Sequence, residues 1–133
     1  MDSLAFIAAE TEEAQLAAKR LSALYGQCGI ADADVIVALG GDGFMLQAIQ
    51  DNMDSGRALY GMNRGTVGFL MNEYSETDLL ARIAAATPET IRPLVMEAET
   101  ADGAMEEARA INEVSLFRQS AQAAKVRISI DGK

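Results

Sequence analysis

The stretch VIVALGGDG, residues Val35–Gly43, joins an unbroken apolar run to three glycines that surround one carboxylate. The apolar run is short and β-branched, which is typical of a central strand covered on both faces of a sheet. Good helix formers follow at 44–50, so the local order is strand, glycine turn, helix. Glycine frees the turn's backbone and leaves room for a ligand beside the N–H groups at the helix start. The stretch therefore predicts a phosphate-binding turn.

Asp42 makes this turn unusual, because the common phosphate loops place small or basic residues there. Neither G-x-x-x-x-G-K-[ST] nor G-x-G-x-x-G occurs in the chain. At about 4 Å and an effective dielectric of 20, Asp42 and one phosphate charge would repel by about 4 kcal/mol. A divalent cation can offset this repulsion, or Asp42 can accept the proton of a hydroxyl that attacks phosphorus. Both options indicate phosphoryl transfer, but an N-cap of a helix beginning near Phe44 explains Asp42 equally well.

Composition limits the classes of protein and of site. The 133 residues suffice for one domain, or one domain and part of another, and half of them are hydrophobic. With no histidine and a single cysteine, Cys28, the chain offers no internal disulfide and no Ser-His or Cys-His nucleophile. Acid–base chemistry therefore falls to carboxylates.

Charge and hydropathy exclude further classes. A formal net charge of -9 argues against a general binder of nucleic acid or of anionic membranes, although not against a nucleotide ligand. No apolar run reaches the roughly 18 residues of a membrane span, and the N-terminus lacks the basic start of a signal peptide. These features predict a cytoplasmic protein.

The first two-thirds of the chain alternate predicted strands and helices. Besides the 35–40 run, strands are expected at 4–9 and 57–62. A helix is expected from Thr11, its N-cap, to a stop at Gly26, with Ala14, Ala17, Leu21 and Leu24 on its apolar side. The β-α-β-α-β order predicts an α/β fold with a Rossmann-like, open parallel sheet. The stretch 75–78, Ser-Glu-Thr-Asp, resembles a capping box that opens a further helix through Ala84.

A second glycine-spaced loop, Gly61–Met71, follows the third predicted strand. In a doubly wound sheet, ligands bind beyond the carboxyl ends of neighbouring strands, and both glycine loops fall at such ends. Asn63 can hydrogen-bond the polar edge of a ligand. Phe69 and Leu70 can cover an aromatic base, but core packing explains each of them more readily when it is taken singly. Arg64 offers a cation for a phosphate, although an exposed loop arginine is the commoner outcome.

The pattern changes near Thr87-Pro88, which predicts domains at 1–88 and 89–133. Extended segments are expected at 91–97, 108–117 and 125–131, which indicates the start of an antiparallel, β-rich second domain. Val126, Ile128 and Ile130 alternate with polar residues, as in a half-buried strand. Asp131-Gly132 is a strong hairpin-turn signal with only Lys133 after it, so we expect this chain to be part of a longer protein.

Asn112 and Glu113 place an amide beside a carboxylate within the apolar stretch 111–114. A regular strand sends neighbouring side chains to opposite faces, unless a bulge or the strand's start turns both toward a ligand. Such a pair suits a ribose diol or the edge of a base. Taken alone, a strand that enters from solvent explains the pair better.

In combination these motifs resemble the NAD kinase family. The matching elements are Gly40–Gly43 after an apolar strand, Gly61–Gly65 running into Val67–Leu70, and Asn112-Glu113 before Val114–Leu116. Gly-Gly-Asp-Gly alone is shared with diacylglycerol, sphingosine and phosphofructo-type kinases, whereas the combination in this order and spacing is much more specific. The resemblance extends from about residue 33 to 133. It is strongest to bacterial members in which the first motif continues as Gly-Phe-Met-Leu.

The resemblance implies transfer of the γ-phosphoryl group of ATP, or of another phosphate donor, to the 2′-hydroxyl of NAD's adenosine ribose, which gives NADP. It implies that Asp42 is the base that deprotonates this hydroxyl and that Gly43 lines the dinucleotide phosphates through its backbone. A divalent cation, usually Mg²⁺, would screen the donor phosphates, with no metal ligand assigned to a residue of this chain.

The resemblance also assigns binding residues and an assembly. Asn112 and Glu113 would bind the dinucleotide, and Asn63, Phe69 and Leu70 would contact it near the adenine. Members of the family combine an α/β domain with a β-rich domain and commonly assemble as dimers or tetramers, so a homo-oligomer is expected.

Two features depart from the family's pattern. Phe44 stands where many members have Thr, and a later Gly/Thr/Ser-rich segment with most of the β domain lies outside this chain. We therefore expect weak or no activity from these 133 residues alone. Two alternatives stay open: a lipid or sugar kinase of the wider Gly-Gly-Asp-Gly class, and a non-catalytic nucleotide-binding fragment.

Overall fold

The computed structural model describes residues 3–65 and 68–133. They form two compact units, one ending at Pro93 and one from Leu94 to Lys133, and each is described by itself. The first unit contains, in order, β1 (Leu4–Ala8), α1 (Glu12–Tyr25), the short 3-10 helix η1 (Ile30–Asp32), β2 (Val35–Gly40), α2 (Asp42–Asp51), β3 (Ala58–Asn63) and α3 (Leu79–Ala85). The second contains β4 (Leu94–Glu99) and β5 (Met105–Ala110). No described helix is long and apolar enough to span a membrane.

The strands of the first unit form a parallel sheet in the order β1-β2-β3. Ala8 pairs with Leu39 and Gly40 pairs with Asn63, so the three strands end at the same level. The predicted α/β fold with a Rossmann-like parallel sheet is confirmed. The loops that follow the three strands consequently meet at one edge of the sheet.

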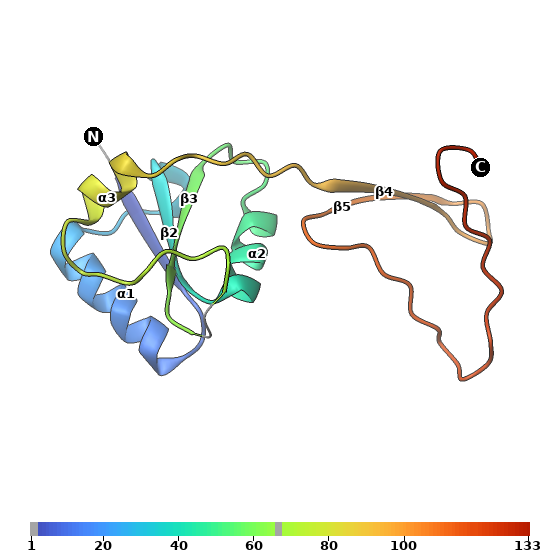
Figure 1. The fold of residues 1–133 in the computed structure, drawn as a ribbon, viewed down its shortest axis with the longest axis horizontal. Coiled ribbons are helices and arrows are strands. Elements are labelled where there is room, and N and C mark those ends of the chain that lie inside the picture. Colours follow the sequence, from blue (N-terminus) through green and yellow to red (C-terminus); the bar gives the residue numbers. More distant parts are fainter. Residues whose placement is uncertain (1–2, 66–67) are drawn as a thin grey trace. The chain divides into compact units, whose positions relative to one another are not determined.

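Helices cover both faces of this sheet. α1 and α3 pack through Leu21 and Leu79 against the face that carries Val37, and α2 packs through Met45 against the face that carries Ala38. Figure 1 shows α1 and α3 on one side of the strands and α2 on the other. This arrangement explains why the central strand is apolar on both of its faces.

β2 forms the centre of the sheet, as the apolar run predicts. Its residues 36–39 are all 0% exposed. Complete burial of one Val, Leu or Ile side chain contributes about 1.5–3 kcal/mol. The strand that leads into the glycine turn is therefore among the most firmly held parts of the first unit.

α1 begins and ends where the sequence predicts. The Thr11 hydroxyl accepts a hydrogen bond from the Ala14 N–H at 3.3 Å, and Gly26 ends the helix with a φ of 83°, which favours glycine. Ala14, Ala17 and Leu21 are buried, but Leu24 is 60% exposed. The prediction that Leu24 shares the buried side is therefore wrong.

The starts of the other two helices differ from the predictions. α2 begins at Asp42, and Gly41 is its N-cap. α3 begins at Leu79 after Asp78, whose side chain makes no capping bond. The predicted capping box is wrong, because the Ser75 hydroxyl instead accepts the Thr77 N–H at 3.2 Å in a local turn.

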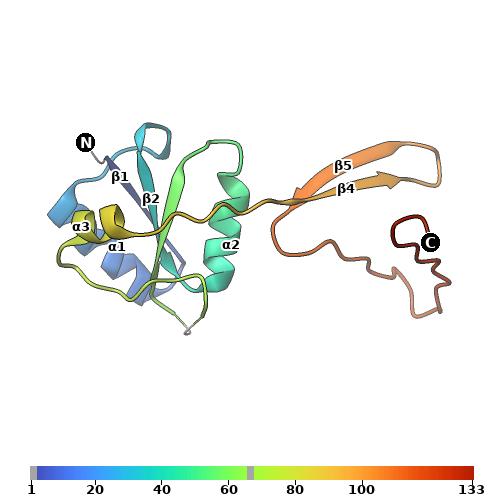
Figure 2. The same ribbon diagram turned by 45° about the horizontal axis from the view of Figure 1, so that its top comes forward.

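In the second unit, β4 and β5 form an antiparallel hairpin with Leu94 opposite Ala110 (Figure 2). Its presence agrees with the antiparallel region expected after the first unit. The predicted strand at 108–117 reaches only Ala110, and the predicted strand at 125–131 is wrong, since the described residues 111–133 contain no strand. An alternating pattern becomes a strand only with a partner for its backbone, and Val126 and Ile128 are 67% and 78% exposed.

The predicted turn at Asp131-Gly132 is confirmed. Ile130 and Lys133 exchange two backbone hydrogen bonds of 2.9 and 3.0 Å. Asp131 and Gly132 have φ values of 50° and 77°. Positive φ at both central residues is the hallmark of the type I′ turn that Asp-Gly favours.

Candidate active site

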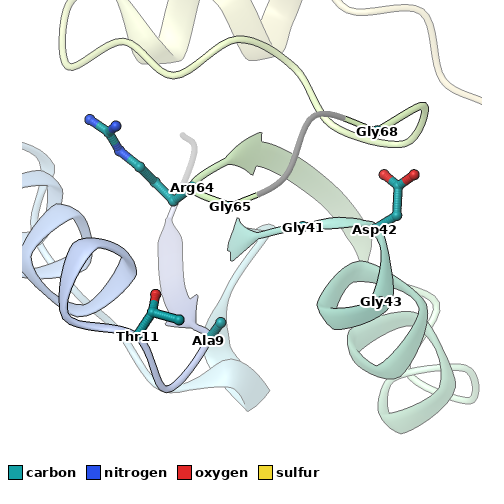
Figure 3. Close-up of a pocket in the computed structure, with 8 residues that line it drawn as sticks. All are labelled: Ala9, Thr11, Gly41, Asp42, Gly43, Arg64, Gly65 and Gly68. Carbon is teal, nitrogen blue, oxygen red and sulfur yellow. The ribbon is translucent and has the colours of Figure 1, made fainter.

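An open hollow of about 430 Å³ lies at the carboxyl edge of the parallel sheet (Figure 3). Its lining comes from the segments that follow β1, β2 and β3: Ala9, Thr11, Gly41, Asp42, Gly43, Arg64, Gly65 and Gly68. Open α/β sheets bind their ligands in this position. Both glycine loops that the sequence singles out therefore contribute to one site.

Asp42 provides the only carboxylate among the described residues that line the hollow. Its Oδ2 accepts the Phe69 N–H at 2.8 Å, and its Oδ1 accepts the Leu70 N–H at 2.9 Å. In Figure 3 the carboxylate points toward the segment at Gly68. Gly41 is the N-cap of α2, and Asp42 is the first residue within the helix. The interpretation of Asp42 as a plain helix cap is therefore wrong.

With these two hydrogen bonds made, the Asp42 carboxylate can still accept further hydrogen bonds. Each carboxylate oxygen carries two lone pairs, and each accepts one of these backbone N–H groups. Beyond these bonds from the described residues, one lone pair on each oxygen is left for the hydroxyl of a ligand. The carboxylate is thus held in place from the second loop while it keeps the capacity to act on a substrate.

Gly43 lies in the first turn of α2 and lines the hollow. A Cβ built on Gly43 would meet nothing within 4 Å, and its φ is not in the left-handed region. Neither packing against residues 3–65 and 68–133 nor the backbone conformation therefore requires glycine here. The first N–H groups of a helix lack intrahelical partners and attract anions, so a missing side chain at this point leaves room for a phosphate.

The two glycine loops approach each other closely. The Arg64 N–H donates to the Gly40 carbonyl at 2.8 Å, and a Cβ on Gly65 would lie 3.4 Å from the Gly41 nitrogen. Asn63, the last residue of β3, accepts the Gly65 N–H through Oδ1 at 3.1 Å. The side-chain amide oxygen of Asn63, predicted from the sequence to bind a ligand, therefore stabilises the loop itself.

The Arg64 side chain points away from Asp42, toward α1 (Figure 3). Its guanidinium forms an ion pair with Glu13 at 2.8 Å and lies 3.5 Å from the centroid of the Tyr74 ring. The side chain is 26% exposed, so the expectation of an exposed loop arginine is wrong, and the guanidinium does not face the hollow as a phosphate ligand would. Among the described lining residues, the Thr11 hydroxyl and backbone N–H groups remain as donors for an anion there.

Tyr74 forms the other side of this contact. Burial raises the pKa of the Tyr74 hydroxyl, and its hydrogen bond to Glu76 at 3.0 Å raises it further, whereas Arg64 acts in the opposite direction. Arg20 of α1 also pairs with Glu76 at 3.4 Å. These contacts fasten the segment after β3 to α1 and so support the loop that carries Phe69.

Phe69 and Leu70 lie beside Asp42 through their backbone N–H groups, but their side chains face outward. Phe69 is fully exposed at 102%, and Leu70 is 38% exposed. The expectation that these residues pack in the core is therefore wrong. An exposed phenylalanine whose backbone is anchored to a carboxylate offers an apolar surface to a planar ligand.

Asn112 and Glu113 belong to the second unit and follow the end of β5 in irregular chain. Both are exposed. The prediction that they lie within a strand is wrong. The alternation of side chains between the two faces of a strand therefore does not apply to this pair. Within the first unit, the structure brings the Asp42 carboxylate together with the backbone N–H groups of Phe69 and Leu70.

No family model matches the chain. Curated proteins nevertheless match it over almost its whole length. The chain is 58% identical over 130 residues to the NAD kinase of Mesorhizobium japonicum, which covers 98% of this chain and 51% of that protein. It is 60% identical over 131 residues to the NAD kinase of Brucella suis, with the same coverage. The resemblance to the NAD kinase family is confirmed. The chain spans about half the length of the curated relatives it matches.

Several residues that line the hollow were not predicted from the sequence as site residues. Thr11 was assigned only as a helix cap, although its place directly after the first strand was a usable signal. Gly65 and Gly68 stood within the second glycine loop, but their contacts with the first loop depend on residues more than 20 positions away in the sequence.

The described residues contain no group of three or more His, Cys, Asp or Glu side chains that could hold a metal ion. Asp42 is the single carboxylate at the described part of the hollow. Mg²⁺ commonly binds one or two carboxylates together with substrate phosphates and waters. The residues present therefore fit an ion that arrives with a phosphate donor better than an ion held by protein ligands alone.

Proposed function

We propose that the full-length protein is an NAD kinase. It transfers the γ-phosphoryl group of ATP to the 2′-hydroxyl of the adenosine ribose of NAD, which gives NADP and ADP. The position of Asp42 is the single observation that carries this proposal: a carboxylate at the start of α2 lines a hollow at the carboxyl ends of parallel strands and keeps lone pairs for a hydroxyl. Relatives named NAD kinase, at 58% and 60% identity over 98% of the chain, support the reaction.

Asp42 acts as the general base in this proposal. It accepts the proton of the 2′-hydroxyl as that oxygen forms a bond to the γ-phosphorus, while the bond from the γ-phosphorus to the bridging oxygen breaks and ADP leaves with the electron pair. A positioned base contributes about 10² to 10⁴ in rate. The bonds from Phe69 and Leu70 fix the direction of the carboxylate before the substrate arrives.

The remaining roles follow the position of each residue. The backbone at Gly43 binds dinucleotide phosphates, because the helix start supplies N–H groups and the missing side chain leaves room. Phe69 and Leu70 cover the adenine with their exposed side chains, and Asn63 lies near it. Asn112 and Glu113 bind the dinucleotide from the second unit.

A divalent cation, Mg²⁺, bound together with the phosphate donor would neutralise charge on the donor phosphates and offset their repulsion from Asp42. The first unit contributes the phosphate-facing N–H groups at the start of α2 rather than a cluster of acidic ligands. We further propose a cytoplasmic protein that works as a homo-oligomer, a dimer or a tetramer, as the family resemblance implies.

An acceptor panel tests the proposed function. The full-length protein is incubated with ATP and Mg²⁺ and, in separate reactions, with NAD, diacylglycerol, sphingosine or fructose 6-phosphate. Phosphorus NMR then locates the new phosphate, and an enzymatic cycling assay measures NADP. A parallel reaction with polyphosphate in place of ATP identifies the donor.

We expect NADP with its new phosphate on the 2′-oxygen. A lipid or sugar that is phosphorylated while NAD is not would replace the proposal with a kinase of the wider Gly-Gly-Asp-Gly class. Calorimetric binding of NAD without turnover of any acceptor would contradict the proposal in favour of a non-catalytic nucleotide-binding protein.

A further inference from the structure

The absence of a side chain at Gly68 is what allows the Asp42 carboxylate to reach the second loop. A Cβ built on Gly68 would overlap the carboxylate carbon and both oxygens of Asp42. The φ of Gly68 is not in the left-handed region, so the backbone conformation does not itself require glycine. The requirement for glycine comes from the carboxylate, which occupies the space that a side chain would fill.

The residues directly after Gly68 are the ones that Asp42 holds. The Phe69 and Leu70 N–H groups donate to separate oxygens of the carboxylate at 2.8 and 2.9 Å. Hydrogen bonds to a charged acceptor are stronger than neutral ones. This pair of bonds therefore fixes the backbone from which the fully exposed Phe69 ring projects.

We propose that Gly68 is a positioning residue for the acceptor substrate: it keeps the Asp42 carboxylate seated under the Phe69 and Leu70 N–H groups, which sets the base and the adenine-facing ring at a fixed separation. The inference rests on the proposed function. It assigns Asp42 two simultaneous tasks, since the lone pairs not used by the loop remain for the ribose hydroxyl. Gly68 acts through Asp42 and Phe69 and does not itself touch the reacting atoms.

Gly68→Ala tests the two tasks of Asp42 separately, because it keeps the carboxylate but places a Cβ in the space that the carboxylate occupies. A misplacement of about 1 Å near reacting groups can cost about 100-fold in rate, so we expect kcat/KM for NAD to fall by about that factor. The KM for NAD should rise while the KM for ATP stays unchanged, because the displaced segment carries the side chains that face the acceptor. A general loss of folding would not divide the two KM values in this way.

Phe69→Ala tests whether Gly68 acts through the ring. If it does, the loss in kcat/KM for NAD in the Gly68→Ala/Phe69→Ala double variant will be smaller than the product of the two single losses. Gly29→Ala is the matched control, because Gly29 lies outside the hollow, has an extended φ of -67° and has ordinary space for a Cβ. Its kinetics should match those of the unaltered protein.

Hydrogen–deuterium exchange of the full-length protein tests the contact without using activity. We expect the amides of residues 69 and 70 to be protected in the unaltered protein and in Gly29→Ala, and to exchange at least about tenfold faster in Gly68→Ala and Asp42→Asn, as for amides released to local opening. Equal exchange in all four proteins would overturn the inference.

The two sets of measurements distinguish failure of the inference from failure of the proposed function. Faster exchange in Gly68→Ala, without any phosphorylation of NAD by the unaltered protein, would support the contact between Gly68 and Asp42. The same result would contradict the NAD kinase assignment. Normal phosphorylation of NAD with kinetics of Gly68→Ala equal to those of Gly29→Ala would keep the function and overturn the role of Gly68.

Discussion

Gly43 occupies a helical position at which glycine is unfavourable, yet none of the described residues comes within 4 Å of a Cβ built there. Alanine within a helix is more stable than glycine by up to about 1 kcal/mol. We expect Gly43→Ala to raise the free energy of unfolding by up to that amount and to weaken NAD binding, since the new methyl group fills the phosphate space. Urea unfolding and calorimetry measure the two effects.

Opposite signs for stability and binding are the informative result at Gly43. Gly29→Ala serves again as the control, because it changes glycine to alanine outside the hollow. If Gly43→Ala gained stability and kept its affinity for NAD, the phosphate site at the start of α2 would be refuted.

At the residue scale, the sequence was sufficient to predict that Asp42 and Gly43 lie at a turn between a strand and a helix, because the strand, the glycines and the helix are contiguous. It was not sufficient for the contact between Asp42 and Gly68, which requires two loops from different strands to meet. The outward direction of Phe69 was also not predictable, because an apolar side chain is more often buried, and here its backbone is held by a carboxylate instead.

At the scale of elements, the strands and helices of the first unit were predictable because each combines a clear hydrophobic period with terminal signals. β2 is apolar on both faces, and α1 has Thr11 and Gly26 at its ends. The segment 125–131 has an equally clear period but no paired strand. Local pattern therefore indicates what a segment favours, whereas pairing depends on partners elsewhere in the protein.

The start of α3 gives a test at this scale. Asp78 has a φ of 53° and makes no capping bond, so its backbone is in the left-handed region without compensation from its side chain. Asp78→Gly should raise the free energy of unfolding by up to about 1 kcal/mol, because glycine adopts this conformation without steric cost. Asp78→Ala should bring no such gain, since alanine keeps the Cβ that strains this backbone conformation. A similar gain in both variants would instead point to the removed charge.

The contact between α1 and the segment after β3 predicts a response to alkaline pH. The pKa of folded Tyr74 is raised above its ordinary value of 10.0, first by burial and then by Glu76. Below pH 10 the hydroxyl is protonated in both states, so its contribution to stability is complete. As pH rises above 10, the unfolded chain ionises first, and the contribution is lost through the folded pKa.

Tyr74→Phe removes this ionisation while retaining the ring beneath Arg64. The free energy of unfolding of the unaltered protein should therefore fall relative to that of Tyr74→Phe as the pH increases beyond 10. Taking the difference between the two proteins cancels the titration of their other groups. Parallel stability curves across this range would show that the Tyr74 hydroxyl is not shielded as the structure indicates.

At the scale of the whole molecule, the residues proposed for function fall in both units. The first unit supplies the base, the helix start and the exposed apolar surface at one edge of a parallel sheet. The second unit carries Asn112 and Glu113 after an antiparallel hairpin. The sequence motifs predict both sets of residues, and the binding roles of Asn112 and Glu113 stay a prediction.

The initial rate of NADP formation by the full-length protein, compared between the unaltered enzyme and Asp42→Asn, tests the central claim most directly. Asn matches Asp in size and cannot accept a proton as a carboxylate does, so kcat should fall at least about 100-fold. Thermal unfolding of both proteins checks that the variant is folded. Turnover of folded Asp42→Asn near that of the unaltered enzyme would contradict the account and leave Asp42 only as the anchor of the second glycine loop.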